Sequence, residues 1–236
     1  MKFVKHVKIS NNVIRRLPRY LRRLDELAAA GVERIFSKEL GEKMRLTSSQ
    51  IRQDFSCFGE FGQQGYGYNV LGLRAEIASI LGIDRNFKMV VVGVGNIGRA
   101  LLESFCFEQY GFKLMGAFDI RPDVVGKTIN GVEILHADGL EELIKAEQVD
   151  AAVLCVQKAS AKRTANSLLS YGIKSIWNFT NVELELDEED IVVEDIHFSD
   201  SLLSMSYYLA ESIDQESIRA EKAKRLNKKV AVKKQQ

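Results

Sequence analysis

The stretch Gly93-Val94-Gly95-Asn96-Ile97-Gly98 decides the fold of this chain. It follows the apolar run 89–92 and precedes the helix-forming run 99–103. The order of strand, G-x-G-x-x-G and helix is the fingerprint of dinucleotide binding. The first glycine permits a tight turn, the second lets the backbone approach a pyrophosphate, and the third lets helix and strand pack closely. The stretch therefore predicts a phosphate-binding helix N-terminus near the middle of the chain.

An acidic residue at the end of the next strand completes this fingerprint. Asp119 follows Phe118 and lies 21 positions after Gly98, where a carboxylate binds ribose hydroxyls. A carboxylate there favours NAD over NADP because it repels a ribose phosphate. The neighbouring Arg121 weakens this preference without reversing it. A glycine-rich turn that serves only packing is the alternative interpretation.

Strand-like and helix-like segments alternate from residue 88 onward, and this alternation predicts a parallel sheet with right-handed crossovers. The strands are expected at 89–92, 114–118, 151–156 and 175–179. The helices between them are expected at 97–108, 139–147 and 159–171. An acidic surface segment, a last helix and a lysine-rich, disordered segment are expected at 183–194, 199–213 and 216–236.

The charge is distributed unevenly along the 236 residues. Residues 1–85 carry 15 Lys and Arg against 9 Asp and Glu, residues 86–218 carry 10 against 22, and residues 219–236 carry 8 against 1. Basic ends suggest a polyanionic partner, and the acidic block argues that the central domain does not lie along DNA. No apolar run approaches a membrane span, and no apolar signal core or metal-ligand spacing is seen. The three separated cysteines indicate reduced thiols in a cytoplasm.

The first 85 residues predict a winged helix-turn-helix. Helices are expected at 11–30, from Ser37, from Thr47 and at 70–81, with a glycine-rich hairpin at 59–67. Pro18 should kink the first helix or mark its first turn. Thr47 and Gln50 fit a capping box at the start of the third helix. A three-helix unit used for dimerisation or for substrate binding is the alternative.

Helical spacing divides the third helix into two faces. Its apolar side holds Ile51, Phe55 and Phe58. Arg52 and Gln50 flank the opposite side, which carries Ser49, Gln53 and Ser56. Arginine suits guanine and glutamine suits adenine through paired hydrogen bonds in the major groove. The hairpin would act as a wing, with Gln63, Gln64 and Tyr66 as probes of the DNA.

A dehydrogenase interpretation lacks its chemical groups. Hydride transfer needs an acid or base and a substrate-orienting group. The three histidines, His6, His136 and His197, fit structural or solvated roles better than catalysis, and no Tyr-x-x-x-Lys is present. The chain after Asp119 suffices to finish one dinucleotide-binding sheet, and leaves no further substrate domain. We therefore expect sensing rather than catalysis, with no catalytic residue and no metal.

Several separate motifs resemble the Rex family of bacterial redox-sensing transcriptional repressors. The resemblance covers about residues 12–213. Its motifs are Arg16-Leu17-Pro18-Arg19-Tyr20-Leu21, Ser37-Lys38-Glu39-Leu40, Gln50-Ile51-Arg52-Gln53-Asp54-Phe55-Ser56, Phe58-Gly59, Gly65-Tyr66-Gly67-Tyr68, the stretch from Gly93 to Gly98, Phe118-Asp119 and Trp177-Asn178-Phe179.

The resemblance implies an α/β protein with three working parts. These are a winged helix-turn-helix DNA-binding domain (1–85), a Rossmann NAD(H)-binding domain (86–198) and a domain-swapped dimerisation helix (199–215), before the basic tail (216–236). It also implies a cytoplasmic homodimer on double-stranded operator DNA with two half-sites. NADH would favour a form that leaves DNA, and NAD the form that binds it.

Residue roles follow from the same resemblance by position. The resemblance implies that the glycine stretch binds the pyrophosphate and that Asp119 binds the adenosine ribose. The nicotinamide end is expected to lie near Val156, Asn178 and Phe179. The complete candidate cofactor set is Gly93, Val94, Gly95, Asn96, Ile97, Gly98, Asp119, Ile120, Arg121, Val156, Asn178 and Phe179. The candidate DNA-binding set is Ser48, Ser49, Gln50, Arg52, Gln53, Ser56, Gln64 and Tyr66.

This chain departs from the family pattern at two positions. Family members often carry Tyr at the position of Phe105 and Asp at the position of His197, where the Asp can pair with an Arg at the position of Arg22. A neutral histidine does not make that ion pair, so the coupling of cofactor to domain angle is expected to be weaker or differently built. Two other hypotheses are a small NAD-dependent oxidoreductase with an N-terminal oligomerisation domain, and a cofactor-binding module that binds protein.

Overall fold

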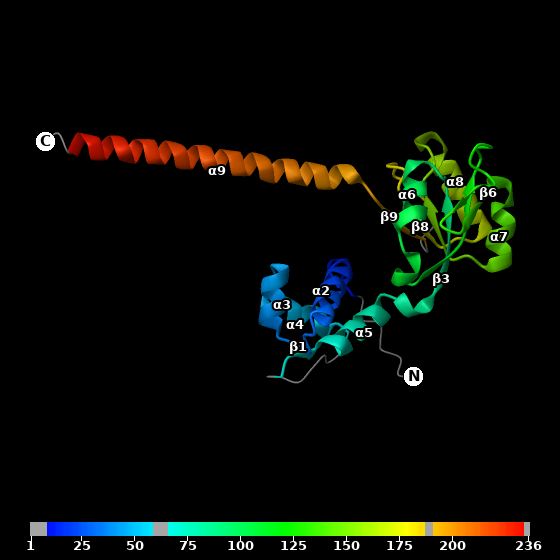
Figure 1. Ribbon diagram of the computed structural model, residues 1–236, viewed down its shortest axis with the longest axis horizontal. Helices are drawn as coiled ribbons and strands as arrows, with labels where there is room; N and C mark the ends of the chain where they lie inside the picture. Colours follow the sequence, from blue (N-terminus) through cyan, green and yellow to red (C-terminus); the bar gives the residue numbers. More distant parts are fainter. Residues whose placement is uncertain (1–8, 59–65, 187–190, 234–236) are drawn as a thin grey trace. The chain divides into compact units, whose positions relative to one another are not determined.

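The structure is a computed structural model, and it divides the protein into two compact units (Figure 1). The structure describes residues 9–58, 66–186 and 191–233. The helical unit comprises residues 1–88 and 106–114, and the sheet unit comprises residues 89–105 and 115–236. The first boundary between the two units falls after Lys88, and the later segment 106–114 joins the helical unit. Phe87 explains this, because its N–H donates to the Gly111 carbonyl at 2.9 Å.

The helical unit is built from short helices and one small two-stranded sheet. Its elements are α1 (Asn11–Ile14), α2 (Leu17–Ala29), β1 (Arg34–Ile35), α3 (Ser37–Met44), α4 (Ser48–Ser56), β2 (Tyr68–Asn69), α5 (Val70–Ile80), and the 3-10 helices η1 (Ile83–Arg85) and η2 (Phe107–Tyr110). Pro18 lies in the first turn of α2 and does not kink it. This position suits proline, whose missing N–H has no intrahelical partner there.

A tight turn joins α3 to α4. Arg45 ends α3 in the left-handed conformation, with φ +57°. A Cβ on Gly41 would lie 2.6 Å from the Leu46 carbonyl oxygen, so only glycine permits this close approach. Thr47 then caps α4, and its side chain accepts a hydrogen bond from the Gln50 N–H at 3.1 Å. These contacts produce the helix-turn-helix that the sequence predicted.

The strands β1 and β2 close the helical unit. They pair antiparallel, with Arg34 opposite Asn69 and Ile35 opposite Tyr68. The expected hairpin at 59–67 falls largely on residues 59–65, which lie outside the described residues. The core beneath contains the apolar face predicted for α4 and the apolar faces of α2, α3 and α5; its buried members are Leu17, Tyr20, Leu24, Leu27, Ile35, Leu40, Met44, Ile51, Phe55, Val70, Leu73 and Ile77.

A buried carboxylate fixes α4 to α2. The Asp54 side chain is fully buried and accepts two hydrogen bonds from the Arg16 guanidinium, at 2.6 and 2.8 Å. Tyr20 donates its hydroxyl to the same carboxylate at 2.6 Å, and Gln50 donates its amide at 2.9 Å. Burial alone would raise the pKa of Asp54, but these donors outweigh it and hold the pKa below its ordinary value. The orientation of α4 thus depends on one ionised group.

The sheet unit is a doubly wound α/β structure. Its sheet has the strand order β5-β6-β4-β3-β7-β8-β9, with parallel pairing between β3 and β7, β4 and β6, β7 and β8, and β8 and β9. The strands are β3 (Phe87–Val92), β4 (Phe112–Asp119), β5 (Thr128–Ile129), β6 (Val132–His136), β7 (Ala151–Leu154), β8 (Ser175–Asn178) and β9 (Val192–Asp195). The Rossmann architecture predicted from the glycine stretch is therefore present.

Helices cover this sheet and bury its apolar strands. They are α6 (Asn96–Ser104), the 3-10 helix η3 (Ala137–Gly139), α7 (Leu140–Glu147) and α8 (Lys158–Tyr171). Leu140 and Ile144 of α7 share one core with Ala161 and Leu168 of α8 and with Val90 of β3. Helix α6 is shorter than the expected 97–108, because the chain turns at Phe105 and then forms η2.

Three strands were not expected from the sequence. β5 and β6 form a short antiparallel hairpin, with Ile129 opposite Val132. β9 (Val192–Asp195) begins within the segment 183–194, for which we expected an acidic surface without a strand, and ends one residue beyond it. Val193 of β9 is partly buried and packs against the core, while Val192 is 63% exposed at the sheet edge. The sequence pattern did not predict this edge strand, because acidic residues surround it and the exposed face of an edge strand needs no apolar residues.

The last helix is longer than expected. α9 runs over Phe198–Lys233, so the helix continues through much of the segment 216–236 that we expected to be disordered. This segment contains no glycine or proline, and its alanines, lysines and arginines favour helix. Among the described residues, no helix is long and apolar enough to cross a lipid bilayer.

Substitution of Asp54 tests the buried carboxylate. We expect Asp54→Asn to lower the free energy of unfolding of the helical unit by about 2 kcal/mol at pH 7, because the Arg16 guanidinium loses its counter-charge. The pKa of Asp54 is held below its ordinary value of 3.8, so its contribution is complete above that pH and disappears as the pH falls through the lower folded-state pKa. Urea denaturation at several pH values measures both effects.

Asp25 provides the matched control. It pairs with Arg74, and both side chains are about half exposed, at 46% and 45%. Asp25→Asn should cost less than about 1 kcal/mol, as is typical of a surface ion pair. Equal losses in the two variants would contradict a special role for Asp54.

Candidate functional site

The glycine stretch forms the tight junction between β3, α6 and β7. Gly93 has φ +94°, and a Cβ there would lie 2.7 Å from the backbone carbonyl of Cys155. A Cβ on Gly98 would lie 2.1 Å from the Gly93 carbonyl oxygen. Neither position accepts a side chain without moving backbone. The first and third glycines therefore serve the turn and the close packing expected of them.

Gly95 differs from the other two glycines because its surroundings are open. No atom lies within 4 Å of the Cβ that it lacks. It is the N-cap of α6, whose first N–H groups and positive dipole end are directed out of the helix. An anion is stabilised at such a helix end, and the missing side chain leaves it room to approach.

A cavity of about 360 Å³ adjoins this helix end. Six of the predicted cofactor residues line it: Gly93, Gly95, Asp119, Ile120, Arg121 and Val156. Val94, Asn96, Ile97, Gly98, Asn178 and Phe179 are not among its lining residues. The sequence did not identify the wall formed by Ala137, Leu140, Cys155, Gln157, Ser160, Arg163, Thr164, Ser167 and Tyr171. Their position after β6 and β7, at the carboxyl end of parallel strands, was the available signal.

Asp119 ends β4 and is the charged centre of this cavity. It is 7% exposed, and it accepts the Val94 N–H at 2.7 Å. The Arg121 backbone N–H lies 2.9 Å from Oδ1, and its guanidinium bonds both carboxylate oxygens, at 3.1 and 3.2 Å. Burial opposes ionisation, but these donors lower the pKa of Asp119 below its ordinary value. The carboxylate is therefore charged near neutral pH.

Asn178 is committed to the fold in this structure. Its side chain is 1% exposed and donates to the Val182 carbonyl at 2.8 Å and to Asp195 Oδ1 at 2.6 Å. Its amide oxygen accepts from the N–H and the hydroxyl of Thr180, at 3.0 and 2.7 Å. These bonds join β8 to β9 and to the following turn. The nicotinamide role stays a prediction for this residue.

Aromatic side chains gather beside the end of β8. The ring centroids of Phe105 and Trp177 lie 5.4 Å apart, and those of Trp177 and Phe179 lie 4.7 Å apart. Phe198 at the start of α9 lies 6.4 Å from Phe179. Phe105, one of the two departures from the family pattern, is thus part of an apolar cluster. At the other departure, the Nδ1 atom of His197 lies 2.7 Å from the amide oxygen of Asn181.

The thiol in the cavity wall is chemically quiet. Burial raises the pKa of Cys155 to about 12, so the thiol is neutral at physiological pH and is a weak nucleophile. Within residues 9–58, 66–186 and 191–233, no cluster of three His, Cys, Asp or Glu side chains is arranged to hold a metal ion.

The exposed side of α4 forms a second candidate site. Ser49, Arg52, Gln53 and Ser56 are exposed, whereas Ser48 and Gln50 are partly buried. Arg52 Nη1 lies 3.2 Å from the Ser37 hydroxyl at the start of α3. Gln50 differs from its expected geometry, because its amide bonds Asp54 rather than closing the capping box. Tyr66 is 65% exposed, and Gln63 and Gln64 lie outside the described residues.

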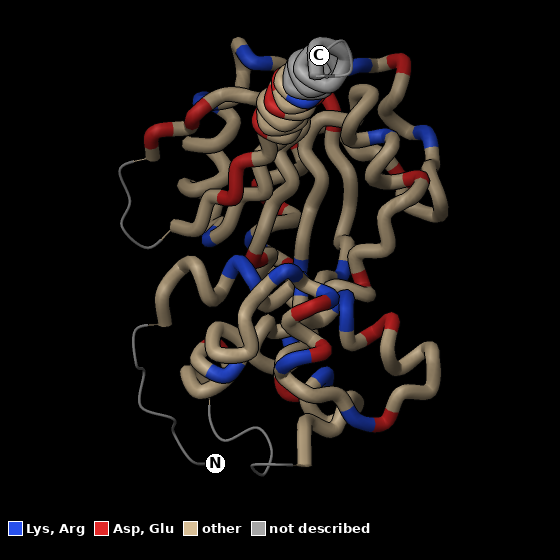
Figure 2. Tube along the Cα trace, turned by 90° about the vertical axis from the view of Figure 1, so that its left-hand side faces the viewer, with Lys and Arg blue, Asp and Glu red and all other residues tan. Residues whose placement is uncertain are grey.

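Charge alone does not single out this face. Figure 2 shows Lys and Arg next to Asp and Glu in the helical unit. Arg19 and Arg23 are directed to the carbonyls of Met44 and Lys43 at the end of α3, each at 3.4 Å. These contacts place cations beside the helix-turn-helix, where they also favour the negative end of the α3 dipole.

Comparison with known proteins gives a family-model match in each unit. Residues 8–56 match a family model described as a putative DNA-binding protein N-terminus, and residues 84–182 match a CoA binding domain. The redox-sensing transcriptional repressor Rex of Caldicellulosiruptor saccharolyticus is 48% identical over 209 residues, covering 89% of this chain and 95% of that protein. The Rex of Thermoanaerobacter pseudethanolicus is 45% identical over 220 residues, covering 93% and 98%.

The chain belongs to the Rex family. Rex proteins are named as transcriptional repressors, so the chain is a redox-sensing repressor rather than an oxidoreductase. Two solved structures agree with this. RSP in complex with β-NAD+ and operator DNA matches with a TM-score of 0.82 and 45% identity, covering 90% of this chain and 98% of RSP. RSP in complex with β-NADH matches with a TM-score of 0.83 and 42% identity, covering 90% and 99%.

Gly98 and Gly95 give a direct test of the cavity geometry. Gly98→Ala should destabilise the sheet unit by about 3 kcal/mol or more, because α6 must move away from the Gly93 carbonyl. Gly95→Ala should change the free energy of unfolding by less than about 1 kcal/mol, because its Cβ meets open space. Urea denaturation of both variants measures the contrast. Similar stabilities would show that the junction is looser than described.

Proposed function

We propose that this chain is a cytoplasmic, homodimeric repressor that responds to the ratio of NADH to NAD+. It binds a palindromic operator when it holds NAD+ or no cofactor, and NADH releases it. The observation that carries this proposal is the open helix end at Gly95 beside the buried carboxylate of Asp119. The solved structures of RSP, a Rex-family repressor, with β-NAD+ and operator DNA and with β-NADH support it.

The cavity fits an adenine dinucleotide by its chemistry. The α6 N-terminus offers N–H groups to the pyrophosphate, and Gly95 leaves the space that a side chain would fill. Asp119 suits a ribose with both hydroxyls free, because each hydroxyl donates to a carboxylate oxygen. The same carboxylate repels the ribose phosphate of NADP or of coenzyme A. NAD(H) is therefore the favoured ligand, although the matching family model carries a coenzyme A description.

The nicotinamide end explains how the two redox forms are distinguished. Val156 lines the cavity, and Phe179 belongs to the aromatic cluster with Trp177 and Phe105. The oxidised nicotinamide ring carries a positive charge, and the reduced ring does not. Transfer of a charged ring into apolar surroundings costs more than transfer of a neutral one. An apolar site at this end would hold NADH more tightly than NAD+.

The DNA-binding part of the proposal rests on α4. Its N-terminus is capped by Thr47, and its apolar side is fixed in the core by Ile51 and Phe55. The exposed Arg52 and Gln53 remain available to base edges in the major groove. The Gln50 amide bonds Asp54 in this structure, and its contact with DNA stays a prediction.

Homodimerisation supplies the operator symmetry. Two recognition helices bind two half-sites only when they are held about one helical turn of DNA apart, or a multiple of it. α9 carries the surface for pairing, since Leu202, Met205 and Leu209 are 60%, 59% and 59% exposed in the single chain. A cofactor that favours another dimer shape breaks the register, and ~2.7 kcal/mol of differential binding shifts the equilibrium about 100-fold.

His197 gives this chain a different coupling from the one expected of the family. It stands where family members often carry Asp, and its Nδ1 lies 2.7 Å from the Asn181 amide oxygen. A histidine side chain never carries a negative charge, so it makes no ion pair with Arg22, and the transition between dimer shapes relies on other contacts here. We expect the response to the cofactor to persist with a smaller amplitude.

A DNA titration tests the proposed function. The probe is a fluorescent operator duplex selected from genomic DNA by the NAD+-bound protein, followed by anisotropy at several NADH to NAD+ ratios. We expect NADH to weaken operator binding at least about tenfold. Gly95→Ala should bind the same duplex and respond little to NADH, because its side chain crowds the pyrophosphate. Equal operator affinity with both cofactors would refute the sensor.

Arg52 tests the DNA-reading face. We expect Arg52→Ala to weaken operator binding by about 1–3 kcal/mol, the range for loss of a base-contacting arginine. NADH binding should not change. Arg85→Ala is the control, because it removes the same charge from η1 rather than from α4. A gel shift for Arg52→Ala that matches the wild type would rule out this assignment.

A further inference from the structure

The Asp119 carboxylate has no free hydrogen-bonding capacity in this structure. An ionised carboxylate offers about four acceptor positions. Oδ1 accepts from the Arg121 backbone N–H at 2.9 Å and from its Nε at 3.1 Å. Oδ2 accepts from the Val94 N–H at 2.7 Å and from Arg121 Nη2 at 3.2 Å. Two hydroxyls of a ribose therefore need two of these positions to be vacated.

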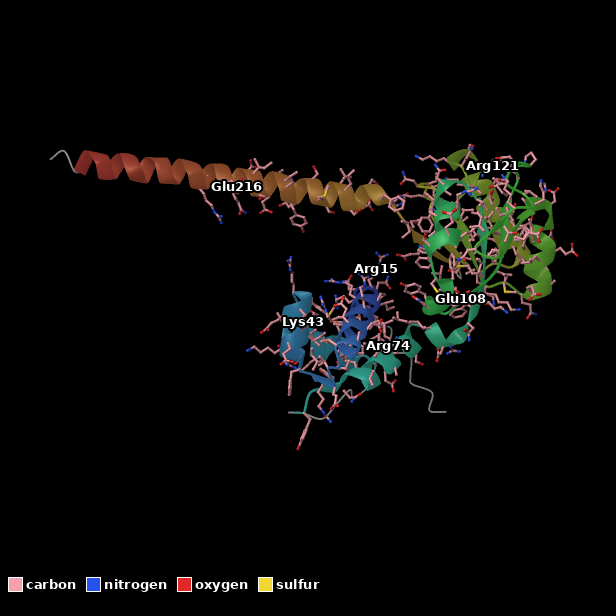
Figure 3. The ribbon with its side chains drawn as sticks, viewed as in Figure 1. Arg15, Lys43, Arg74, Glu108, Arg121 and Glu216 are labelled. Atoms are coloured by element: carbon pink, nitrogen blue, oxygen red, sulfur yellow. The ribbon has the colours of Figure 1, made fainter. Side chains whose placement is uncertain are left out.

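The four donors are of two kinds. The N–H groups of Val94 and Arg121 belong to the backbone of two turns and are fixed in place. The Arg121 guanidinium, labelled in Figure 3, belongs to a side chain of the sheet unit. That side chain is 45% exposed, so it can rotate into solvent. A single further bond, to the Val94 carbonyl at 2.8 Å, holds it over the carboxylate. The displaceable donors are thus equal in number to the ribose hydroxyls.

We propose that Arg121 occupies the ribose positions of Asp119 and that its displacement sets the affinity of the cavity for the coenzyme. This inference rests on the proposed function, because it requires an adenine dinucleotide in the cavity. The adenosine ribose is the same in NAD+ and in NADH. The cost of moving Arg121 is therefore common to both forms. Arg121 sets the coenzyme concentration at which the protein responds, and it leaves the preference for NADH unchanged.

The opposite role for Arg121 has an opposite signature. A guanidinium that contacts the bound coenzyme would strengthen binding, and its removal would weaken binding. A guanidinium that must leave the carboxylate weakens binding, and its removal strengthens it. The sign of one substitution therefore separates the two roles.

The experiment compares the full chain with Arg121→Gln. NADH binding is followed by the fluorescence of the reduced ring, and NAD+ and ADP binding by competition with NADH. We expect Arg121→Gln to bind all three about three- to tenfold more tightly, as for release of a partly exposed ion pair. The ratio of NAD+ to NADH affinity should stay as in the wild type. The gain should be smaller for 2′-deoxy-ADP, which brings one ribose hydroxyl instead of two.

Lys145→Gln is the matched control. It removes one positive charge from α7 of the same unit, where Lys145 pairs with Glu141 and does not line the cavity. Its coenzyme affinities should equal those of the wild type. Arg121→Lys keeps the charge but lacks the planar fork that matches both carboxylate oxygens, so it should share part of the gain. It serves as the test if the glutamine variant fails to fold.

Three results would overturn the proposal while the proposed function stands. These are unchanged or weaker coenzyme binding in Arg121→Gln, an altered ratio of NAD+ to NADH affinity, or an equal gain for ADP and 2′-deoxy-ADP. A wild-type protein that binds neither NADH nor NAD+ would instead refute the proposed function, and this inference with it.

Discussion

The close approach of three backbone segments is the constraint on which the sheet unit depends. Gly98 brings α6 against the Gly93 carbonyl, and Gly93 brings the turn against the backbone at Cys155. No side chain fits between these segments, so the start of α6 is held at the carboxyl ends of β3 and β7. That placement leaves Gly95 facing open space and aligns it with Asp119 at the end of β4. The anion-binding helix end and the acidic group thus meet as a consequence of packing, before any ligand is considered.

Each unit is organised around one carboxylate, Asp54 or Asp119. The two carboxylates differ in the groups that donate hydrogen bonds to them. Asp54 receives its hydrogen bonds from the side chains of Arg16, Tyr20 and Gln50, all within or beside a buried core. Its bonds fix two helices for the lifetime of the fold. Asp119 receives half of its bonds from an exposed guanidinium, which solvent or a hydroxyl can replace. The first arrangement is suited to holding a reading helix rigid, and the second to exchanging partners.

Local patterns predicted the elements that local chemistry defines. The turn between β3 and α6, the place of Asp119 at the end of β4, the Thr47 cap and the central strands follow from short-range spacing, and the structure confirms these positions. The cofactor roles of the glycine stretch and Asp119 stay predictions. What depends on distant partners was not predicted. The Gln50 amide is directed to Asp54, where Arg16 and Tyr20 converge, and the Asn178 amide donates to Asp195 of β9, 17 residues away. β9 was hidden by its acidic neighbours, and the α8 wall of the cavity is visible only once the sheet is assembled.

The exposed apolar residues of α9 have a consequence for the life of the protein in the cell. A newly made copy that has not yet met its counterpart presents Leu202, Met205 and Leu209 to water. Such a surface invites chaperones and proteases, since exposed hydrophobic helices mark incomplete molecules. If the chain dimerises through α9 as proposed, dimers accumulate only when new copies are made faster than unpaired copies are degraded. The abundance of this regulator therefore has a lower bound set by encounter rate, and halving its expression removes more than half of its active form.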